Sequence, residues 1–176
     1  MSESAAVSQS ANMSDLLPTN FVGTTMCAAQ SDDGKFRVYF QNKDYQIYEM
    51  SLNDPKSTTY TLLKLTNSNM PAARINTPIA AVACNNLQEI RVYYITVDSR
   101  VQEICHTQRH GWQKCETLGT AVENSTCLYA QDRSSRDTSA SDHNKGMLRV
   151  GFQSAAAPQT ITEAYRMNDE WKIRVL

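Results

Sequence analysis

No hydrophobic run in the 176-residue sequence approaches the length of a membrane-spanning helix, and no charged-then-apolar segment opens the chain. A spanning helix needs about 20 apolar residues, and a secretory signal needs an apolar core behind a positively charged start. We therefore expect neither feature, and we expect the chain to stay in the cytoplasm unless a non-classical route exports it. Lys and Arg are spread singly and the net charge is -1, so we expect no nucleic acid or membrane partner.

The sequence also lacks the motifs of common enzyme classes. Only six glycines are present, and no Gly-rich loop of the kind that cradles phosphates occurs. There is no Gly-x-Ser-x-Gly elbow, no His-x-Glu signature and no recurring pair of acids suited to glycoside hydrolysis. Because no nucleophile is accompanied by a base, we expect a protein without catalytic activity and without a cofactor.

The five cysteines cannot all form pairs, and most of them lie in apolar segments, where a thiol behaves as a small hydrophobic side chain. We therefore expect reduced, buried thiols. Cys105, His106, His110 and Cys115 could be imagined as zinc ligands. The familiar Cys-x2-Cys spacing is missing, however, and the segment spans a predicted strand and turn, so we predict no metal site there.

A pattern that occurs three times predicts the architecture. Its copies are FRVYFQNKDYQIYE at 36–49, IRVYYITVDSRVQE at 90–103 and LRVGFQSAAAPQTITE at 148–163. Each copy starts with an apolar residue and Arg-Val and ends in Glu. The Arg and Glu are twelve residues apart in the first two copies (37 to 49, 91 to 103) and fourteen in the third (149 to 163), where we expect residues 155–158 to lengthen a turn.

The period of this repeat suits one small antiparallel sheet per copy, because the Arg positions are 54 residues apart (37 to 91) and then 58 (91 to 149). A strand of small residues precedes each copy, at 26–29, 79–82 and 127–130, and an apolar strand follows it. Small side chains fit the crowded innermost strands of a propeller. The sequence therefore predicts an all-β fold of three four-stranded β-propeller blades, at about residues 21–75, 76–122 and 123–176.

Two segments are too polar to join these blades. Residues 1–20 are rich in Ser, Ala and Asn, and such a segment cannot bury enough surface to offset its ordering entropy, so we expect a disordered tail. Residues 132–146, DRSSRDTSASDHNKG, interrupt the third repeat between its first two strands. We interpret them as a mobile hairpin loop.

Each Arg–Glu pair lies on consecutive antiparallel strands, so the two side chains can face each other on one side of a sheet. A guanidinium beside a carboxylate offers donors next to acceptors, which suits the vicinal hydroxyls of a sugar. An isolated pair would be interpreted as a cross-strand salt bridge worth ~0.2–1 kcal/mol. Three copies in register, with Trp112 and Trp171 nine and eight residues after Glu103 and Glu163, favour a sugar site instead. Each Trp can also serve as a core residue at a blade edge.

The small-residue strand, the Ile-Arg-Val-Tyr-Tyr and Val-Gln-Glu-Ile-Cys segments and the Gly111-Trp112 pair together resemble the blade repeat of the fungal fucose-specific lectins of the Aleuria aurantia type. The resemblance covers about residues 21–176 and implies blades from one half of a six-bladed propeller. It also implies fucose sites between adjacent blades, with fucose-containing glycans as partners. The implied residues are Arg37, Glu49 and Trp112 for one site and Arg91, Glu103 and Trp171 for another.

The chain departs from the pattern of this family at several positions. The family usually has an aromatic residue three positions after the Glu, and here those positions hold Leu52, His106 and Arg166. His106 still offers a ring face, whereas Arg166 cannot form a comparable apolar wall. The first repeat has no Trp, and Tyr60 is the nearest candidate for its role. A propeller whose sugar sites have decayed, kept for protein–protein contacts, is therefore the alternative function.

Three blades make half a ring, so the outer faces of the first and third repeats would expose apolar surface. We expect a homodimer in which two chains close a six-bladed ring. Closure would set Arg149 and Glu163 of one chain against the first repeat of the other, near Tyr60, and we expect this site to be the weakest.

Overall fold

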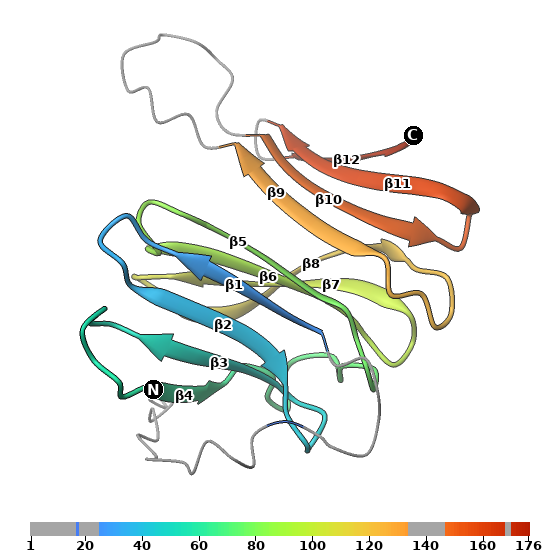
Figure 1. The fold of residues 1–176 in the computed structure, drawn as a ribbon. Coiled ribbons are helices and arrows are strands. Elements are labelled where there is room, and N and C mark those ends of the chain that lie inside the picture. Colours follow the sequence, from blue (N-terminus) through green and yellow to red (C-terminus); the bar gives the residue numbers. More distant parts are fainter. Residues whose placement is uncertain (1–16, 18–24, 134–146, 168–169) are drawn as a thin grey trace, which may run out of the picture.

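The computed structural model describes residues 17, 25–133, 147–167 and 170–176. In these residues, twelve strands form three four-stranded antiparallel sheets, and no helix is long and apolar enough to cross a membrane (Figure 1). Blade one contains β1 (Met26–Gln30), β2 (Phe36–Gln41), β3 (Ile47–Leu52) and β4 (Thr61–Lys64). Blade two contains β5 (Ile79–Cys84), β6 (Glu89–Ile95), β7 (Arg100–Thr107) and β8 (Gly111–Thr120). Blade three contains β9 (Leu128–Arg133), β10 (Met147–Ser154), β11 (Ala157–Met167) and β12 (Glu170–Val175).

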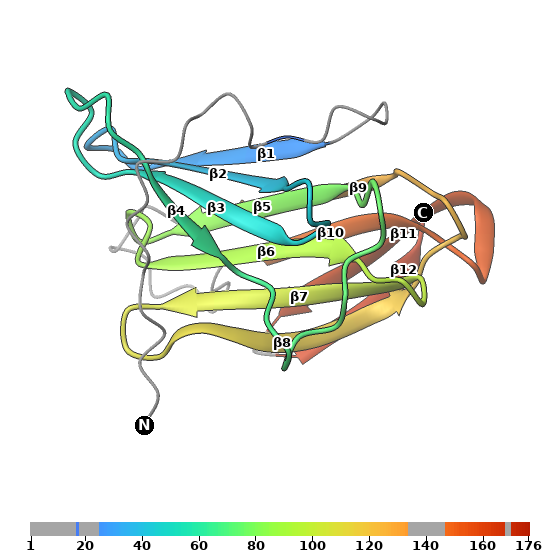
Figure 2. The ribbon, with the colours of Figure 1, turned by 90° about the horizontal axis from the view of Figure 1, so that it is seen from below.

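Within each blade the strands pair in sequence order, and the blades stack face against face (Figure 2). The small-residue strands contact one another in succession, β1 with β5 and β5 with β9. Their Ala and Cys side chains let these backbones approach closely, which overrides the low β-propensity of Ala. The predicted all-β fold of three four-stranded blades is confirmed.

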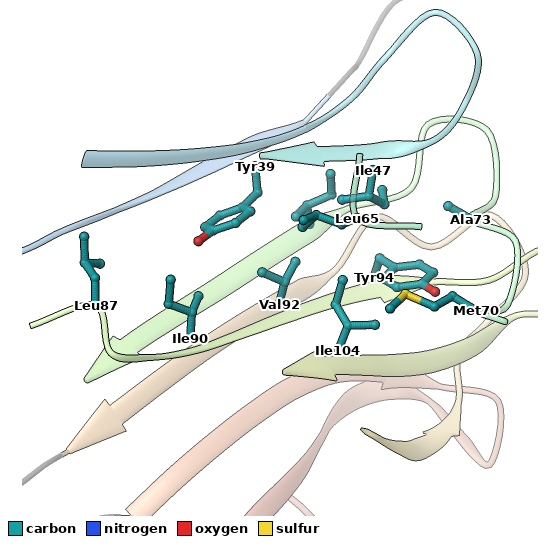
Figure 3. Packing of buried hydrophobic residues seen from close by; sticks show 11 residues of the cluster. Tyr39, Ile47, Leu65, Met70, Ala73, Leu87, Ile90, Val92, Tyr94 and Ile104 are labelled. Atoms are coloured by element: carbon teal, nitrogen blue, oxygen red, sulfur yellow. The ribbon is translucent and has the colours of Figure 1, made fainter. Parts of the chain in front are cut away.

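Apolar side chains fill the space between neighbouring blades. Tyr39 and Ile47 of blade one point toward Val92, Tyr94 and Ile104 of blade two, and all five are fully buried (Figure 3). A second cluster joins the other face of blade two to blade three. Each large apolar side chain buried in this way contributes roughly 1.5–3 kcal/mol, so these clusters hold the blades together.

Blade two is covered on both faces, and its sequence reflects this. Tyr93 and Tyr94 are adjacent in β6 and point to opposite faces, yet both are 0% exposed. Tyr94 packs in the cluster shared with blade one and Tyr93 in the cluster shared with blade three. The strand is therefore almost continuously apolar, whereas a strand with one solvent-exposed face would alternate apolar and polar residues.

Blades one and three each leave one face without a neighbouring blade. On blade one, β2, β3 and β4 align Val38, Met50 and Leu62 in a cross-strand row on this face. All three are partly exposed, whereas Val92 and Ile104, which hold the matching positions of blade two, are 0% exposed. The free face of blade one is thus an unpaired copy of an inter-blade surface.

The prediction of a long turn in the third repeat is wrong. Ser154 pairs with Ala157, so only Ala155 and Ala156 form the turn, and Pro158 lies within β11. The two additional residues are absorbed by longer strands and by a register shift between Phe152 and Ser154.

The two polar segments fall largely outside the described residues. Of the predicted tail, only Leu17 is described. Of the predicted loop at 132–146, Asp132 and Arg133 belong to β9, so the loop begins later than expected, and the remaining residues lie outside the described ranges.

The prediction of reduced thiols is wrong for one pair, because Cys105 and Cys115 form a disulfide between β7 and β8. Their Cα atoms are 6.1 Å apart. Cys105 pairs with Gln113, so Cys115 is its diagonal neighbour on the same face of the sheet, and no spacing rule in the sequence reveals this register. Both sulfurs are consumed, so they are not available as thiolate ligands for the zinc site considered above. Among the free thiols, burial raises the pKa of Cys27 to about 12.

Candidate functional site

Strand pairing places the Arg and Glu of each repeat on one face of its blade. Tyr39 pairs with Glu49 and Tyr93 with Glu103, and in blade three Gly151 pairs with Glu163. The Arg lies two residues before the Tyr or Gly, which in a strand is the same face. The sets of blades one and two therefore face the next blade along the chain, and the set of blade three lies on the face that no described blade covers. We call the sets around Glu49, Glu103 and Glu163 site one, site two and site three.

In site one, the buried carboxylate of Glu49 accepts two hydrogen bonds from blade one. The Tyr39 hydroxyl donates to Oε2 at 2.9 Å, and Ser51 Oγ donates to Oε1 at 2.7 Å. Burial, and then the charge of Glu49, raise the pKa of Tyr39, so its hydroxyl remains a donor. Arg37 Nε lies 3.6 Å from Glu49 Oε1.

The guanidinium of Arg37 is fixed by groups at the end of the hairpin. It donates to the backbone oxygen of Phe36 at 2.8 Å and of Leu52 at 3.3 Å, and to Asn53 Oδ1 at 2.7 Å. Its position beside Glu49 is thus set before any ligand arrives, which lowers the entropy cost of binding.

Blade two supplies two aromatic side chains to site one. The Trp112 ring lies edge-on to Tyr39, with centroids 6.1 Å apart, and His106 lies 5.3 Å from Trp112. Burial lowers the pKa of His106, and Glu49 and Arg37 act on its charge in opposite directions. His106 is therefore neutral at pH 7, and site one combines a charged pair with an uncharged aromatic wall.

Among the three Arg–Glu pairs that the repeat predicts, the pair of site two is the closest. Arg91 Nη1 lies 2.8 Å from Glu103 Oε1, which also accepts the Tyr93 hydroxyl at 2.9 Å. The backbone N–H of Glu116 donates to the other oxygen at 3.3 Å. Glu103 is 1% exposed and Arg91 is partly exposed, so the Arg reaches solvent over a buried carboxylate. Arg91 also donates to Cys105 Sγ at 3.4 Å, which joins the disulfide to this site.

Blade three covers site two with a different pair of residues. Trp171 packs against the cluster that contains Tyr93, and Arg166 lies opposite Trp171 in the pairing of β11 with β12. Arg166 is close enough to oppose the rise in the pKa of Tyr93 that burial and Glu103 cause. The guanidinium of Arg166 therefore occupies the position in site two that the His106 ring occupies in site one.

In site three, residues that the sequence did not suggest surround Glu163. Arg174 of β12 donates from Nε to Glu163 Oε1 at 2.9 Å, and the Tyr129 hydroxyl of β9 donates to Oε2 at 3.2 Å. The predicted partner, Arg149, is farther away, with Nη1 3.8 Å from Oε2. Its Nε donates to Met147 Sδ at 2.9 Å.

The Tyr of site three has moved to the neighbouring strand. Tyr129 pairs with Gly151 across β9 and β10, where blade two has Ala80 opposite Tyr93. A Cβ atom on Gly151 would lie 2.0 Å from Tyr129 Cε1, so the Tyr ring fills the space above the glycine. Two features of the sequence could have indicated this exchange: a Tyr in the small-residue strand, and a Gly where the other repeats have an aromatic residue after Arg-Val.

The structure brings together most of the predicted site residues. Arg37, Glu49, His106 and Trp112 gather in site one. Arg91 pairs with Glu103, and Trp171 packs against the cluster of Tyr93, which donates to Glu103. Tyr60 belongs instead to the free face of blade one, the face that Leu52 shares with Met50. It directly precedes β4, one residue beyond the pair Ser51 and Thr61, at the register position that Trp112 occupies in blade two.

Comparison with known proteins gives one family. The model of the fungal fucose-specific lectins matches residues 21–175. No curated protein sequence is similar enough to count as a relative.

Several solved structures share the fold. A triple Arg-to-Ala mutant of AofleA from Arthrobotrys oligospora superposes with a TM-score of 0.71 at 16% identity, covering 91% of this chain and 43% of that one. The lectin of Aleuria aurantia, described as a six-bladed β-propeller with a novel fucose recognition mode, gives a TM-score of 0.64 at 21% identity, with coverage of 88% and 49%. A fucose lectin from Kordia zhangzhouensis in complex with methyl-fucoside gives 0.60 at 16%, with coverage of 85% and 97%. This chain thus spans less than half of the first two proteins and has the fold of half a six-bladed propeller.

Proposed function

The chain belongs to the fungal fucose-specific lectin family, and from this premise we propose that it binds L-fucose and fucosylated glycans at sites one and two without catalysing a reaction. The observation that carries the proposal is the same in both sites. A buried Glu with an Arg beside it on one blade meets a Trp from the next blade.

The chemistry of this arrangement matches a deoxysugar. The Arg supplies N–H donors and the Glu supplies acceptor lone pairs, so adjacent sugar hydroxyls can donate to one and accept from the other. The Trp offers an apolar face to the C–H side of the ring. In site one, the neutral His106 adds a second ring face suited to the C6 methyl group, which distinguishes fucose from galactose of the same hand.

A titration of the protein with methyl α-L-fucoside, followed by calorimetry and Trp fluorescence, tests the proposal. We expect saturable binding with a change in Trp emission. Methyl α-L-galactoside, identical except for a hydroxyl on C6, should bind about tenfold more weakly or worse, because that hydroxyl would be buried without a partner. Absence of any fucoside signal at the highest concentration reached would favour the alternative, a protein-interaction propeller whose sugar sites have decayed.

We further propose that two copies of the chain close a six-bladed ring. On the free face of blade one, Val38 and Met50 match Val92 and Ile104, which are fully buried between blades one and two. On the free face of blade three, Tyr129 and Ile161 are 39% and 46% exposed. A two-fold assembly would cover both faces and bring site three of one copy toward Tyr60 of the other.

Light scattering tests this assembly. The protein should have twice the mass of one chain, and Met50→Lys should yield folded monomers, because a buried charge in the new interface is unfavourable. Thr58→Lys, an exposed loop change, is the matched control and should leave the dimer intact. A folded wild-type protein with the mass of one chain at micromolar concentration would contradict ring closure.

A further inference from the structure

Site three differs from the other two sites in its charge. Two guanidinium groups, from Arg149 on β10 and Arg174 on β12, converge on the single carboxylate of Glu163. That carboxylate is 3% exposed, while the two Arg side chains are 37% and 45% exposed. The positively charged guanidinium groups are therefore solvent-accessible, whereas the negatively charged carboxylate is buried beneath them.

The second cation is specific to blade three. Register places Arg174 opposite Glu163, whereas Leu63 stands opposite Glu49 in blade one. In blade two, the shifted register leaves the backbone N–H of Glu116 at this place. Counting only residues of their own blades, sites one and two each contain one Arg and one Glu, whose charges balance. Arg166 adds a cation to site two from blade three, and there Asp132 acts on Arg91 as a compensating acid.

In the described part of the chain, no such acid balances site three. The charged groups that act on the Tyr129 hydroxyl, which lies at the centre of the site, are Glu163, Arg149 and Arg174, and the sum of their charges is +1. Both oxygens of Glu163 already accept, Oε1 from Arg174 and Oε2 from Tyr129. Both oxygens of the Glu are also occupied in sites one and two, so the second guanidinium is what distinguishes site three. A ligand that brings its own negative oxygens finds additional N–H donors there.

Arg149 is the group that could meet such a ligand. Within the described residues, Arg149 donates from Nε to Met147 Sδ, and its Nη1 approaches Glu163 only to 3.8 Å. A guanidinium carries five N–H donors in a planar fork that matches a carboxylate or a sulfate. The exposed ring of Tyr129 lies in the same site and provides a surface for a sugar ring.

We propose that site three binds an acidic saccharide, one that carries a carboxylate or a sulfate ester, through Arg149 and Arg174. The inference rests on the proposed function only in treating site three as a sugar site. The protein would then combine neutral fucose sites with a separate site of different specificity.

The test uses two matched pairs of simple glycosides. Methyl β-D-glucuronide is compared with methyl β-D-glucoside for the carboxylate, and methyl β-D-galactoside 6-sulfate with methyl β-D-galactoside for the sulfate. At low salt, at least one acidic member should bind about tenfold or more tightly than its neutral partner. Added salt should weaken its binding, because charges on exposed groups are screened over about 10 Å at 0.1 M ionic strength.

Variants locate the effect. Arg174→Gln and Arg149→Gln should each reduce binding of the acidic glycoside about tenfold or more, while Arg100→Gln, which removes the same charge from an exposed strand end, should not. Thermal unfolding of each variant shows whether it is folded. Equal binding of acidic and neutral members in both pairs, or full acidic binding by folded Arg174→Gln, would overturn the proposal. Methyl α-L-fucoside, titrated in parallel, reports on sites one and two, so a failure of fucose binding is recognised separately.

Discussion

Arg91→Ala should lower the affinity of site two for methyl α-L-fucoside about thirtyfold, which corresponds to about 2 kcal/mol. The loss arises because a sugar hydroxyl and the buried Glu103 would both lose their charged donor. The protein should still fold, since Tyr93 and the N–H of Glu116 continue to donate to Glu103. Calorimetry should report fewer sites at the wild-type affinity, and Arg100→Ala is the control for the lost charge.

A double-mutant cycle of Arg91 and Trp171 shows whether the two residues bind fucoside in one site or in two independent sites. Trp171→Ala should weaken the same site as Arg91→Ala, and the double variant should lose less than the sum of the two single losses. Strictly additive losses would mean that the two residues serve different sites, and the assignment of Trp171 to the site of the preceding blade would be wrong.

Gly151→Ala should destabilise the protein by about 2 kcal/mol. The added Cβ would lie 2.0 Å from the Tyr129 ring, so the ring must leave and its hydrogen bond to the buried Glu163 is lost. Urea unfolding measures the change. The exchange of both residues, Gly151→Tyr with Tyr129→Ala, recreates the Tyr93 and Ala80 arrangement of blade two and should restore stability to within about 1 kcal/mol of wild type.

Gly111→Ala is the control for this result. Its φ of 64° makes alanine unfavourable by roughly 1 kcal/mol, but nothing lies within 4 Å of the added Cβ, so Tyr129→Ala cannot rescue it. A Gly151→Ala protein as stable as wild type would show that Tyr129 does not fill this space.

The repeat made most of the fold predictable. Side chains in a strand alternate between two faces, so a conserved spacing of Arg and Glu about a hairpin fixes which residues face the next blade. Within one chain, three copies of that spacing revealed the blades and placed Arg91 beside Glu103. Trp112 and Trp171 could be assigned across blades only through the resemblance to the lectin family, because inter-blade contacts leave no periodic signal.

The residues that were missed depend on exchanges between strands. In blade three the large residue, Tyr129, lies in β9 and the small one, Gly151, lies in β10, the reverse of blade two. Within its own strand, each residue is a single departure from the repeat pattern. Arg174 reaches Glu163 from the outermost strand, where the other blades have Leu63 or a displaced backbone. The Cys105–Cys115 disulfide depends on the register of β7 and β8, which makes the two cysteines diagonal neighbours and which no simple pattern in the sequence specifies.

The most direct test of fucose binding between blades is a crystal structure of the protein with methyl α-L-fucoside. We expect one fucoside between blades one and two, contacting Arg37, Glu49 and Trp112, and one between blades two and three, contacting Arg91, Glu103 and Trp171. Fucoside bound elsewhere on the molecule, with both of these sites empty at saturating concentration, would contradict this expectation.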